Sequence, residues 1–83
     1  MQQTNEIQSS LKREYDLYSS AMAFYQNTLK ALEQEYNLST QAFLKKFESG
    51  ELGDKADYFD WYAHAKLLAK WRKAQSEIRS AVQ

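Results

Sequence analysis

The stretch FESGELGDKADYFDW, residues 47–61, is the one part of this 83-residue chain whose composition does not favour continuous helix. It contains both glycines of the protein and five acidic residues, and three of its last four residues are aromatic. Glycine adopts positive φ without strain, so it is the residue most easily placed where a helix ends. The stretch is therefore either a turn that sends one helix back along another, a metal or catalytic loop, or a recognition surface.

On the N-terminal side of this stretch, apolar residues recur at alternating steps of four and three along residues 11–36. This spacing marks one face of an α-helix, and it is sustained over more than three heptads. The row consists of Leu11, Tyr15, Tyr18, Met22, Tyr25, Leu29, Leu32 and Tyr36. A second, narrower row of Leu17, Ala21, Phe24 and Ala31 widens the apolar surface. We expect a long helix over residues 5–36, with more apolar surface than one neighbouring helix can cover.

A short helix is predicted over residues 40–49. Ser39 is a suitable N-cap, and Leu38 and Phe43 occupy the two positions of a hydrophobic staple. Gly50 follows the helix at the position where a left-handed conformation costs least. These signals favour the structural interpretation of the turn.

A third helix is predicted over residues 55–82. Asp54 is a natural N-cap, and Asp57 would place a carboxylate in the first turn, where the helix dipole favours it. The row that recurs at steps of three and four is Trp61, His64, Leu68, Trp71, Gln75, Ile78 and Val82, flanked by Leu67, Ala74 and Ala81. The pattern again indicates one helix face packed against a neighbour.

Together these elements predict an all-α protein with a single domain over residues 1–83. Its two long antiparallel helices form a hairpin, with the short helix at the elbow that joins them. Residues 1–36 carry three bases and five acids, and residues 58–83 carry five bases and two acids. The resulting charges of −2 and +3 favour antiparallel pairing of the two long helices.

Composition excludes several classes of protein. The chain has no cysteine, which rules out disulfides, thiolate metal sites and a cysteine nucleophile. No run approaches the ~18 apolar residues of a membrane span, and the N-terminus lacks the apolar core of a signal peptide. We expect a protein that acts in the cytoplasm without a membrane.

The acidic residues of the elbow do not form a recognisable metal site. They are Glu48, Glu51, Asp54, Asp57 and Asp60, and their spacing does not match the calcium loop of an EF-hand. Asp54 and Asp57 are better explained as a helix cap and a first-turn acid. The two glycines lie three residues apart and do not form a phosphate-binding loop.

His64 is the only histidine, and it lies on the packed face of the third helix. With no second imidazole and no cysteine, it does not complete a zinc site or a catalytic triad of recognisable kind. Packing or hydrogen bonding is the favoured role for this side chain. We expect no enzyme activity, no catalytic residue, no metal and no cofactor.

Lys66, Lys70 and Lys73 lie on one face of the third helix by their spacing. They form either a solvated face or a set of contacts with phosphate groups or an acidic partner. Because the formal net charge of the chain is zero, strong binding of nucleic acid is not expected.

Aromatic residues are the most informative excess, with six tyrosines, four phenylalanines and two tryptophans. Most are expected in the core, but a two-helix hairpin buries only one face of each helix. Tyrosine and tryptophan dominate protein–protein hot spots, and large exposed apolar surfaces mark interfaces. The candidate partner-binding residues are Tyr18, Met22, Tyr25, Trp61, His64, Leu68 and Trp71. The expected partner is another protein or a second copy, in a hetero-complex or a homodimer.

The segment from Leu32 to Lys73 resembles the C-terminal half of small prokaryotic helical proteins that are classed as antitoxin-like and are encoded beside a small toxin. The elements that carry the resemblance are Tyr36, Ser39, Phe43, the run Gly50-Glu51-Leu52-Gly53-Asp54, and Asp57 with Phe59 and Trp61. The resemblance covers about half of the chain and implies a non-enzymatic role in binding a partner protein. The chain lacks an evident N-terminal DNA-binding domain, so control of a promoter is not implied.

Overall fold

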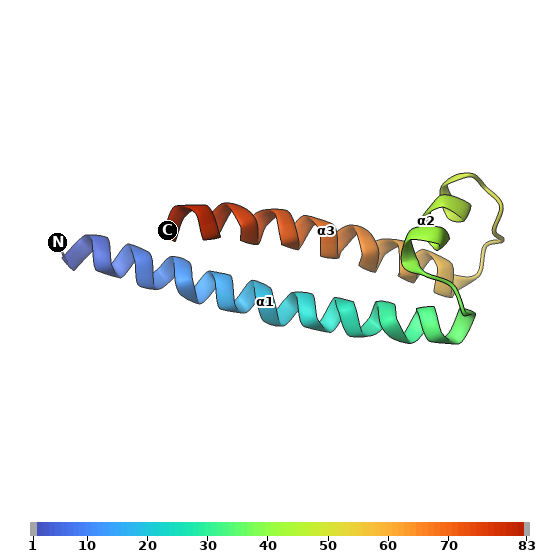
Figure 1. Ribbon diagram of the computed structural model, residues 1–83, viewed down its shortest axis with the longest axis horizontal. Helices are drawn as coiled ribbons and strands as arrows, with labels where there is room; N and C mark the ends of the chain where they lie inside the picture. Colours follow the sequence, from blue (N-terminus) through green and yellow to red (C-terminus); the bar gives the residue numbers. More distant parts are fainter. Residues whose placement is uncertain (1, 83) are drawn as a thin grey trace.

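The computed structural model describes the backbone of residues 2–82 and the side chains of residues 6–81. It contains three helices, α1 (Gln2–Tyr36), α2 (Thr40–Glu48) and α3 (Ala56–Val82), and no strand within residues 2–82. Figure 1 shows α1 and α3 running antiparallel, side by side, with α2 at the end where they are joined. The predicted all-α hairpin with a short helix at the elbow is confirmed.

The helix boundaries differ from the expected ones at three places. The first helix begins at Gln2 rather than near residue 5, and the short helix ends at Glu48 rather than at residue 49. The third helix begins at Ala56 rather than at residue 55. The first turns of α1 extend beyond the end of α3, so this part of α1 has no neighbouring helix (Figure 1).

Two of the helices end in the same hydrogen-bonded turn. After α1, Asn37 has φ 50°, and the Leu38 amide donates to the Glu33 carbonyl over 3.1 Å. After α2, Gly50 has φ 77°, and the Glu51 amide donates to the Lys46 carbonyl over 3.0 Å. A left-handed residue followed by this six-to-one hydrogen bond is a Schellman motif. The predicted positive φ at the glycine after the short helix is confirmed.

The helix starts follow the sequence signals at one site and depart from them at the other. Ser39 caps α2, since its hydroxyl oxygen accepts from the Ala42 amide over 3.1 Å. The interpretation of Asp54 as the cap of α3 is wrong. The helix begins at Ala56, so Lys55 occupies the N-cap position and Asp54 lies one residue too early. Asp57 lies in the first turn of α3, as expected.

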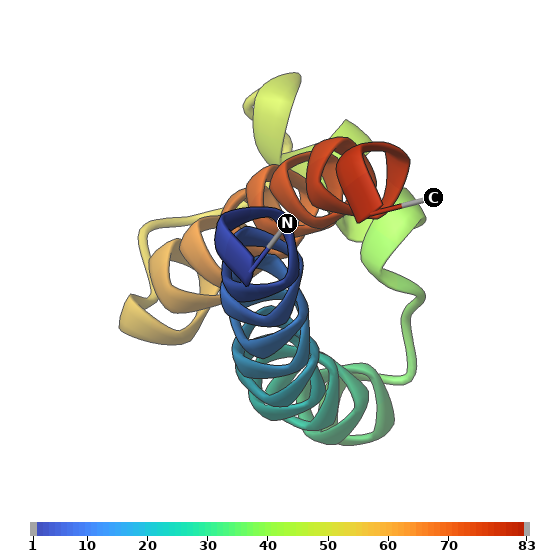
Figure 2. The same cartoon turned by 90° about the vertical axis from the view of Figure 1, so that its left-hand side faces the viewer.

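The core gathers around the elbow, which we define as residues 37–55, including α2, together with the adjoining ends of α1 and α3. Among side chains 6–81, only Leu29, Phe43, Trp61 and Leu68 are buried. Trp61 stacks on Phe43, with ring centroids 4.0 Å apart and planes 3° from parallel. The end-on view in Figure 2 shows α2 (green) to one side of the pair formed by α1 and α3. A short helix thus supplies the aromatic ring that covers the start of α3.

Candidate protein-binding surface

Two of the predicted partner-binding residues belong to the protein's own core. Trp61 has no exposed surface, and Leu68 is 5% exposed. The Trp61 indole nitrogen donates to the Thr40 hydroxyl over 3.0 Å, which satisfies its one polar atom inside the chain. In this conformation neither side chain offers a surface to a partner, and their role as contact residues stays a prediction. Both side chains belong to the row of α3 that packs against α1 and α2, so they point into the chain and not toward solvent.

The other predicted contact residues lie half-buried along the junction of α1 and α3. Tyr18 meets Trp71 edge to face, with ring centroids 4.8 Å apart. Tyr25 meets His64 in the same manner at 5.5 Å. Met22 is half-buried and packs against the core cluster. These five side chains hold the two long helices together, and their role toward a partner stays a prediction.

The His64 ring is held by a hydrogen bond within α3 and by aromatic contacts with α1. Its Nδ1 lies 2.7 Å from the Asp60 carbonyl oxygen, which only accepts hydrogen bonds, so Nδ1 carries the proton. The ring also lies next to the Phe24 ring, with centroids 6.4 Å apart. The histidine is thus held by its own helix and faces two aromatic rings of α1.

The largest exposed apolar side chains near this junction are not those of the predicted set. Leu17 is 67% exposed, Phe24 63% and Leu67 39%. Helical spacing places Leu17 and Phe24 in the second apolar row of α1, and the contact between Phe24 and His64 brings that row beside α3. We call this surface the apolar face and define it by Leu17, Ala21, Phe24 and Ala31 of α1 with His64, Leu67, Trp71 and Ala74 of α3.

No member of the apolar face carries a formal charge with His64 neutral. A shallow hollow of about 220 Å³ lies on its α3 side, lined by Leu67, Lys70, Trp71 and Ala74. Large apolar side chains that are exposed together on a small protein mark an interaction surface more often than isolated ones do. The sequence signal for this surface was the second apolar row of α1. The predicted partner-binding residues of α1 were instead taken from the row that packs against α3.

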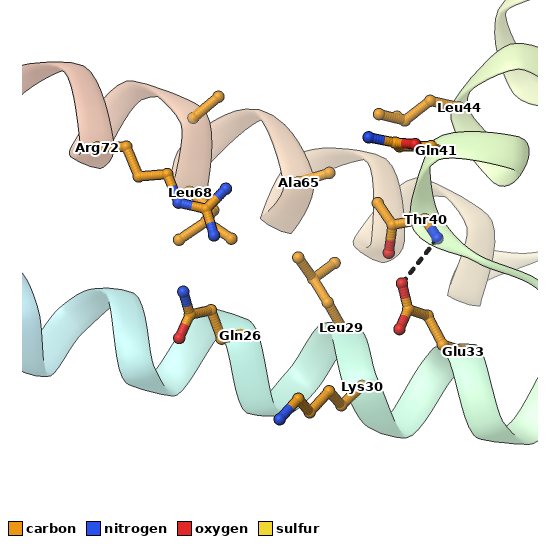
Figure 3. A pocket seen from close by; sticks show the side chains of 11 residues that line it. Gln26, Leu29, Lys30, Glu33, Thr40, Gln41, Leu44, Ala65, Leu68 and Arg72 are labelled. Carbon is orange, nitrogen blue, oxygen red and sulfur yellow. Dashed lines mark hydrogen bonds between the residues drawn. The ribbon is translucent and has the colours of Figure 1, made fainter.

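A groove lies between the three helices and is lined by residues from both sides of the elbow (Figure 3). Its volume is about 550 Å³, and the apolar side chains that line it include Leu29, Leu44 and Leu68. Arg72 of α3 reaches toward Gln26 of α1 across the groove, as the close view shows. Helical spacing separates this groove from the second apolar row of α1, because Gln26 and Phe24 project in different directions.

The only acid among the lining residues is Glu33, and it has a structural role. Its Oε2 accepts from the Thr40 amide over 2.7 Å, which supports the first turn of α2. Within residues 6–81, no group of three or more histidine, cysteine or acidic side chains lies where it could hold a metal ion. The groove therefore has the cationic groups of Lys30 and Arg72 and the amide groups of Gln26 and Gln41 among its lining residues. Its one carboxylate accepts a hydrogen bond from the backbone of α2.

The three lysines of α3 are exposed but not equivalent. Lys66 Nζ lies 3.3 Å from Glu48 Oε2 of α2 and 5.2 Å from the centroid of the Tyr62 ring. Lys70 borders the hollow on the apolar face. The contact with α2 leaves Lys66 less available to a phosphate group than the other two.

One titratable group at the elbow departs from its ordinary behaviour. The Tyr36 hydroxyl donates to Asp57 Oδ2 over 2.6 Å and thereby ties the end of α1 to the first turn of α3. This hydrogen bond, together with partial burial, raises the pKa of Tyr36 well above its usual range. The raised pKa means that Tyr36 stays protonated in the folded chain to a higher pH than in the unfolded chain.

Comparison of the chain with protein-family models, curated proteins and solved structures found no match. Along the part of the chain that the structure describes, none of the helices combines the length and apolar character needed to cross a membrane. The candidate site therefore rests on the geometry of the apolar face and on the sequence.

Proposed function

We propose that the chain is a non-enzymatic protein-binding module that acts through the apolar face. The observation that carries the proposal is the joint exposure of Leu17, Phe24 and Leu67 on one uncharged surface. Apolar surface left in water costs about 25 cal/mol per Å², and covering it with a partner recovers that free energy. Aromatic residues at the floor of this face, Trp71 among them, are the type that dominates binding hot spots.

We further propose that the natural partner is a small protein encoded beside this chain, as for an antitoxin-like member of a two-protein system. The resemblance of residues 32–73 to such proteins supports this assignment. The residues of the shared motif include Phe43, Gly50 and Trp61, all of which build the elbow. Under this proposal the motif maintains the hairpin, and the apolar face carries the specificity for the partner.

The test is co-expression of the tagged chain with each protein encoded by a flanking gene, followed by size-exclusion chromatography with light scattering. A stable complex with one of them is expected. Phe24→Glu places a charge at the centre of the apolar face and should weaken the complex by about 30-fold or more, as loss of an anchor does. Ala23→Glu is the matched control, since Ala23 is exposed and adjacent in sequence but projects about 100° away around α1.

Absence of a complex with either neighbour would remove the two-protein assignment. A complex that survives Phe24→Glu and is lost in Ala23→Glu would place the binding surface elsewhere on α1. A self-assembling structural protein and a weak nucleic-acid-binding regulator are the competing classes. They predict no such complex, and the second predicts binding that depends on the lysines of α3.

A further inference from the structure

We infer that the apolar face of the free chain binds a second copy of the chain, antiparallel, across a two-fold axis that passes near Phe24. This inference deepens the proposed function, on which it rests for the choice of surface. It adds the identity of one partner and the register of the contact. In a two-fold contact of this kind, α1 packs on α1 of the second copy, and α3 on its counterpart.

The side chains of α1 are arranged symmetrically about Phe24 in a way that suits self-pairing. Leu17 and Ala31 each lie seven residues from Phe24, so an antiparallel copy places the large side chain of one chain opposite the small one of the other. Alternation of large and small residues across facing positions is what allows helices to interdigitate. Both residues are exposed within the single chain.

Charge follows the same symmetry at the ends of the row. Arg13 and Glu35 each lie eleven residues from Phe24, on opposite sides, and both are exposed. In the antiparallel register Arg13 of one copy faces Glu35 of the other, and the two-fold axis makes two such pairs. Among the described side chains the one ion pair within the chain joins Lys66 and Glu48, so these two charges remain available. A parallel register would bring like charges together, which disfavours it.

The α3 side of the face is compatible with the same axis. His64 contacts Phe24, and Leu67 lies one turn farther along α3, so Leu67 falls close to the axis. Asp60 and Ala74 each lie seven residues from Leu67, and Lys70 lines the hollow beside Ala74. An antiparallel copy therefore brings Asp60 near a lysine of the other chain. Uncharged side chains fill the centre, and opposite charges meet toward the ends.

The size of the face suits a stable dimer. The apolar face together with the charged residues at its ends, Arg13 and Glu35, is roughly 33 Å long at 1.5 Å per residue, and two packed helices are about 20 Å wide. The flat area of roughly 660 Å² approaches the ~800 Å² per partner of a standard interface. The resulting four-helix bundle would cover residues 13–35 of α1, of which residues 13–22 have no buried side chain within the single chain.

Cross-linking tests the register directly, because the chain has no native cysteine. Ser20 and Thr28 each lie four residues from Phe24, one on either side. We expect a short bismaleimide to cross-link a mixture of Ser20→Cys and Thr28→Cys chains, and each variant alone to cross-link poorly. Efficient cross-linking of each variant with itself, and not of the mixture, would show a parallel register and overturn the inference. Ala23→Cys, on a different side of α1, should not cross-link.

Sedimentation equilibrium of the unmodified chain supplies the second measurement, with a dimer expected at micromolar concentration. Arg13→Glu and Glu35→Arg should each raise the dissociation constant of the dimer by about two- to fivefold, and mixing the two variants should restore association. A monomer at high micromolar concentration would overturn this inference. If that monomer still binds a flanking-gene product through Phe24, the proposed function stands. If the chain forms the dimer but binds neither flanking-gene product, this inference stands and the two-protein assignment falls.

Discussion

The two ends of the hairpin are built very differently. At the elbow, the rings of Tyr36 and Phe43 contact Trp61, whose indole nitrogen donates to the Thr40 hydroxyl. The Tyr36 hydroxyl donates to Asp57 there. At the open end, formed by residues 6–22 of α1 and residues 71–81 of α3, no described side chain is buried. The chief links there are the Tyr18–Trp71 contact and a hydrogen bond from Gln75 to the Tyr15 carbonyl.

This difference separates the part of the chain that has a core of its own from the part that would gain one from the proposed neighbour. Full burial of an apolar side chain contributes about 1.5–3 kcal/mol, and all four buried side chains lie in the half of the molecule near the elbow. Small domains have little core to spare. We interpret the elbow as the folding anchor of the hairpin and the open end as the part that a partner or a second copy completes.

The largest effect is expected from Trp61→Ala. Truncation of a fully buried tryptophan costs about 3–5 kcal/mol, which approaches the whole stability of a small domain. It also leaves the Thr40 hydroxyl without its partner. Chemical denaturation followed by circular dichroism measures the loss. Trp71→Ala is the matched comparison at the open end and should cost clearly less, because Trp71 is only half-buried. Equal losses would contradict the distinction between the two ends.

A smaller effect is expected at the turn after α2. Gly50→Ala should cost about 1 kcal/mol, because an alanine at φ 77° is strained even though the space around it is open. For a domain of this size that lowers the melting temperature by about 4–8 °C. Gly53 has no positive φ and equally open surroundings, so Gly53→Ala should be neutral or slightly stabilising. Thermal melts of the two variants decide whether Gly50 alone requires glycine.

Much of this fold could be predicted from periodicity and capping signals. The row of α1 from Leu11 to Tyr36 indeed lies against the rest of the chain, since each of its members is buried or half-buried. The start of α3 could not be placed, because an aspartate at position 54 suits a cap but also suits an extended turn. Local signals locate helices better than their terminal residues.

The candidate site was harder to predict for a physical reason. Apolar residues at helical spacing show that a helix has an apolar side. They do not show whether that side lies against another helix or in solvent. Trp61 was a natural candidate for a partner contact until the structure placed Phe43 of α2 over its ring, a contact made across eighteen residues of chain. Leu17 and Phe24 were recognised as a second row, but their exposure depends on how α1 and α3 turn toward each other.

The hydrogen bond between α1 and α3 at the elbow gives a pH-dependent prediction. The pKa of Tyr36 is raised in the folded chain, first by its hydrogen bond to Asp57 and then by burial. Its contribution is complete below pH ~10, where an ordinary tyrosine is protonated, and is lost at higher pH as the unfolded chain ionises first. Tyr36→Phe should lower stability at pH 7, and its difference from the unmodified chain should shrink above pH 10.

Denaturation of both proteins between pH 7 and pH 11 measures this difference and cancels the contributions of the other five tyrosines. Tyr15→Phe is the control at the open end, where no side-chain hydrogen bond of the tyrosine hydroxyl occurs among the described residues. A Tyr36→Phe variant whose deficit stays constant up to pH 11 would show that the hydrogen bond to Asp57 does not stabilise the elbow.

The smallest effect is expected for nucleic acid. Of the three lysines on α3, Lys66 is paired with Glu48, which leaves Lys70 and Lys73 to meet phosphates. Two phosphate contacts give a salt slope of only about −2, and binding to a DNA duplex at physiological salt should be weaker than about 100 µM. Fluorescence anisotropy with unmodified chain, Lys70→Glu and the α1 control Lys12→Glu measures this. Submicromolar binding that Lys70→Glu abolishes and Lys12→Glu leaves intact would favour a nucleic-acid-binding regulator. The lysines of α3, rather than the apolar face, would then be the functional surface of the hairpin.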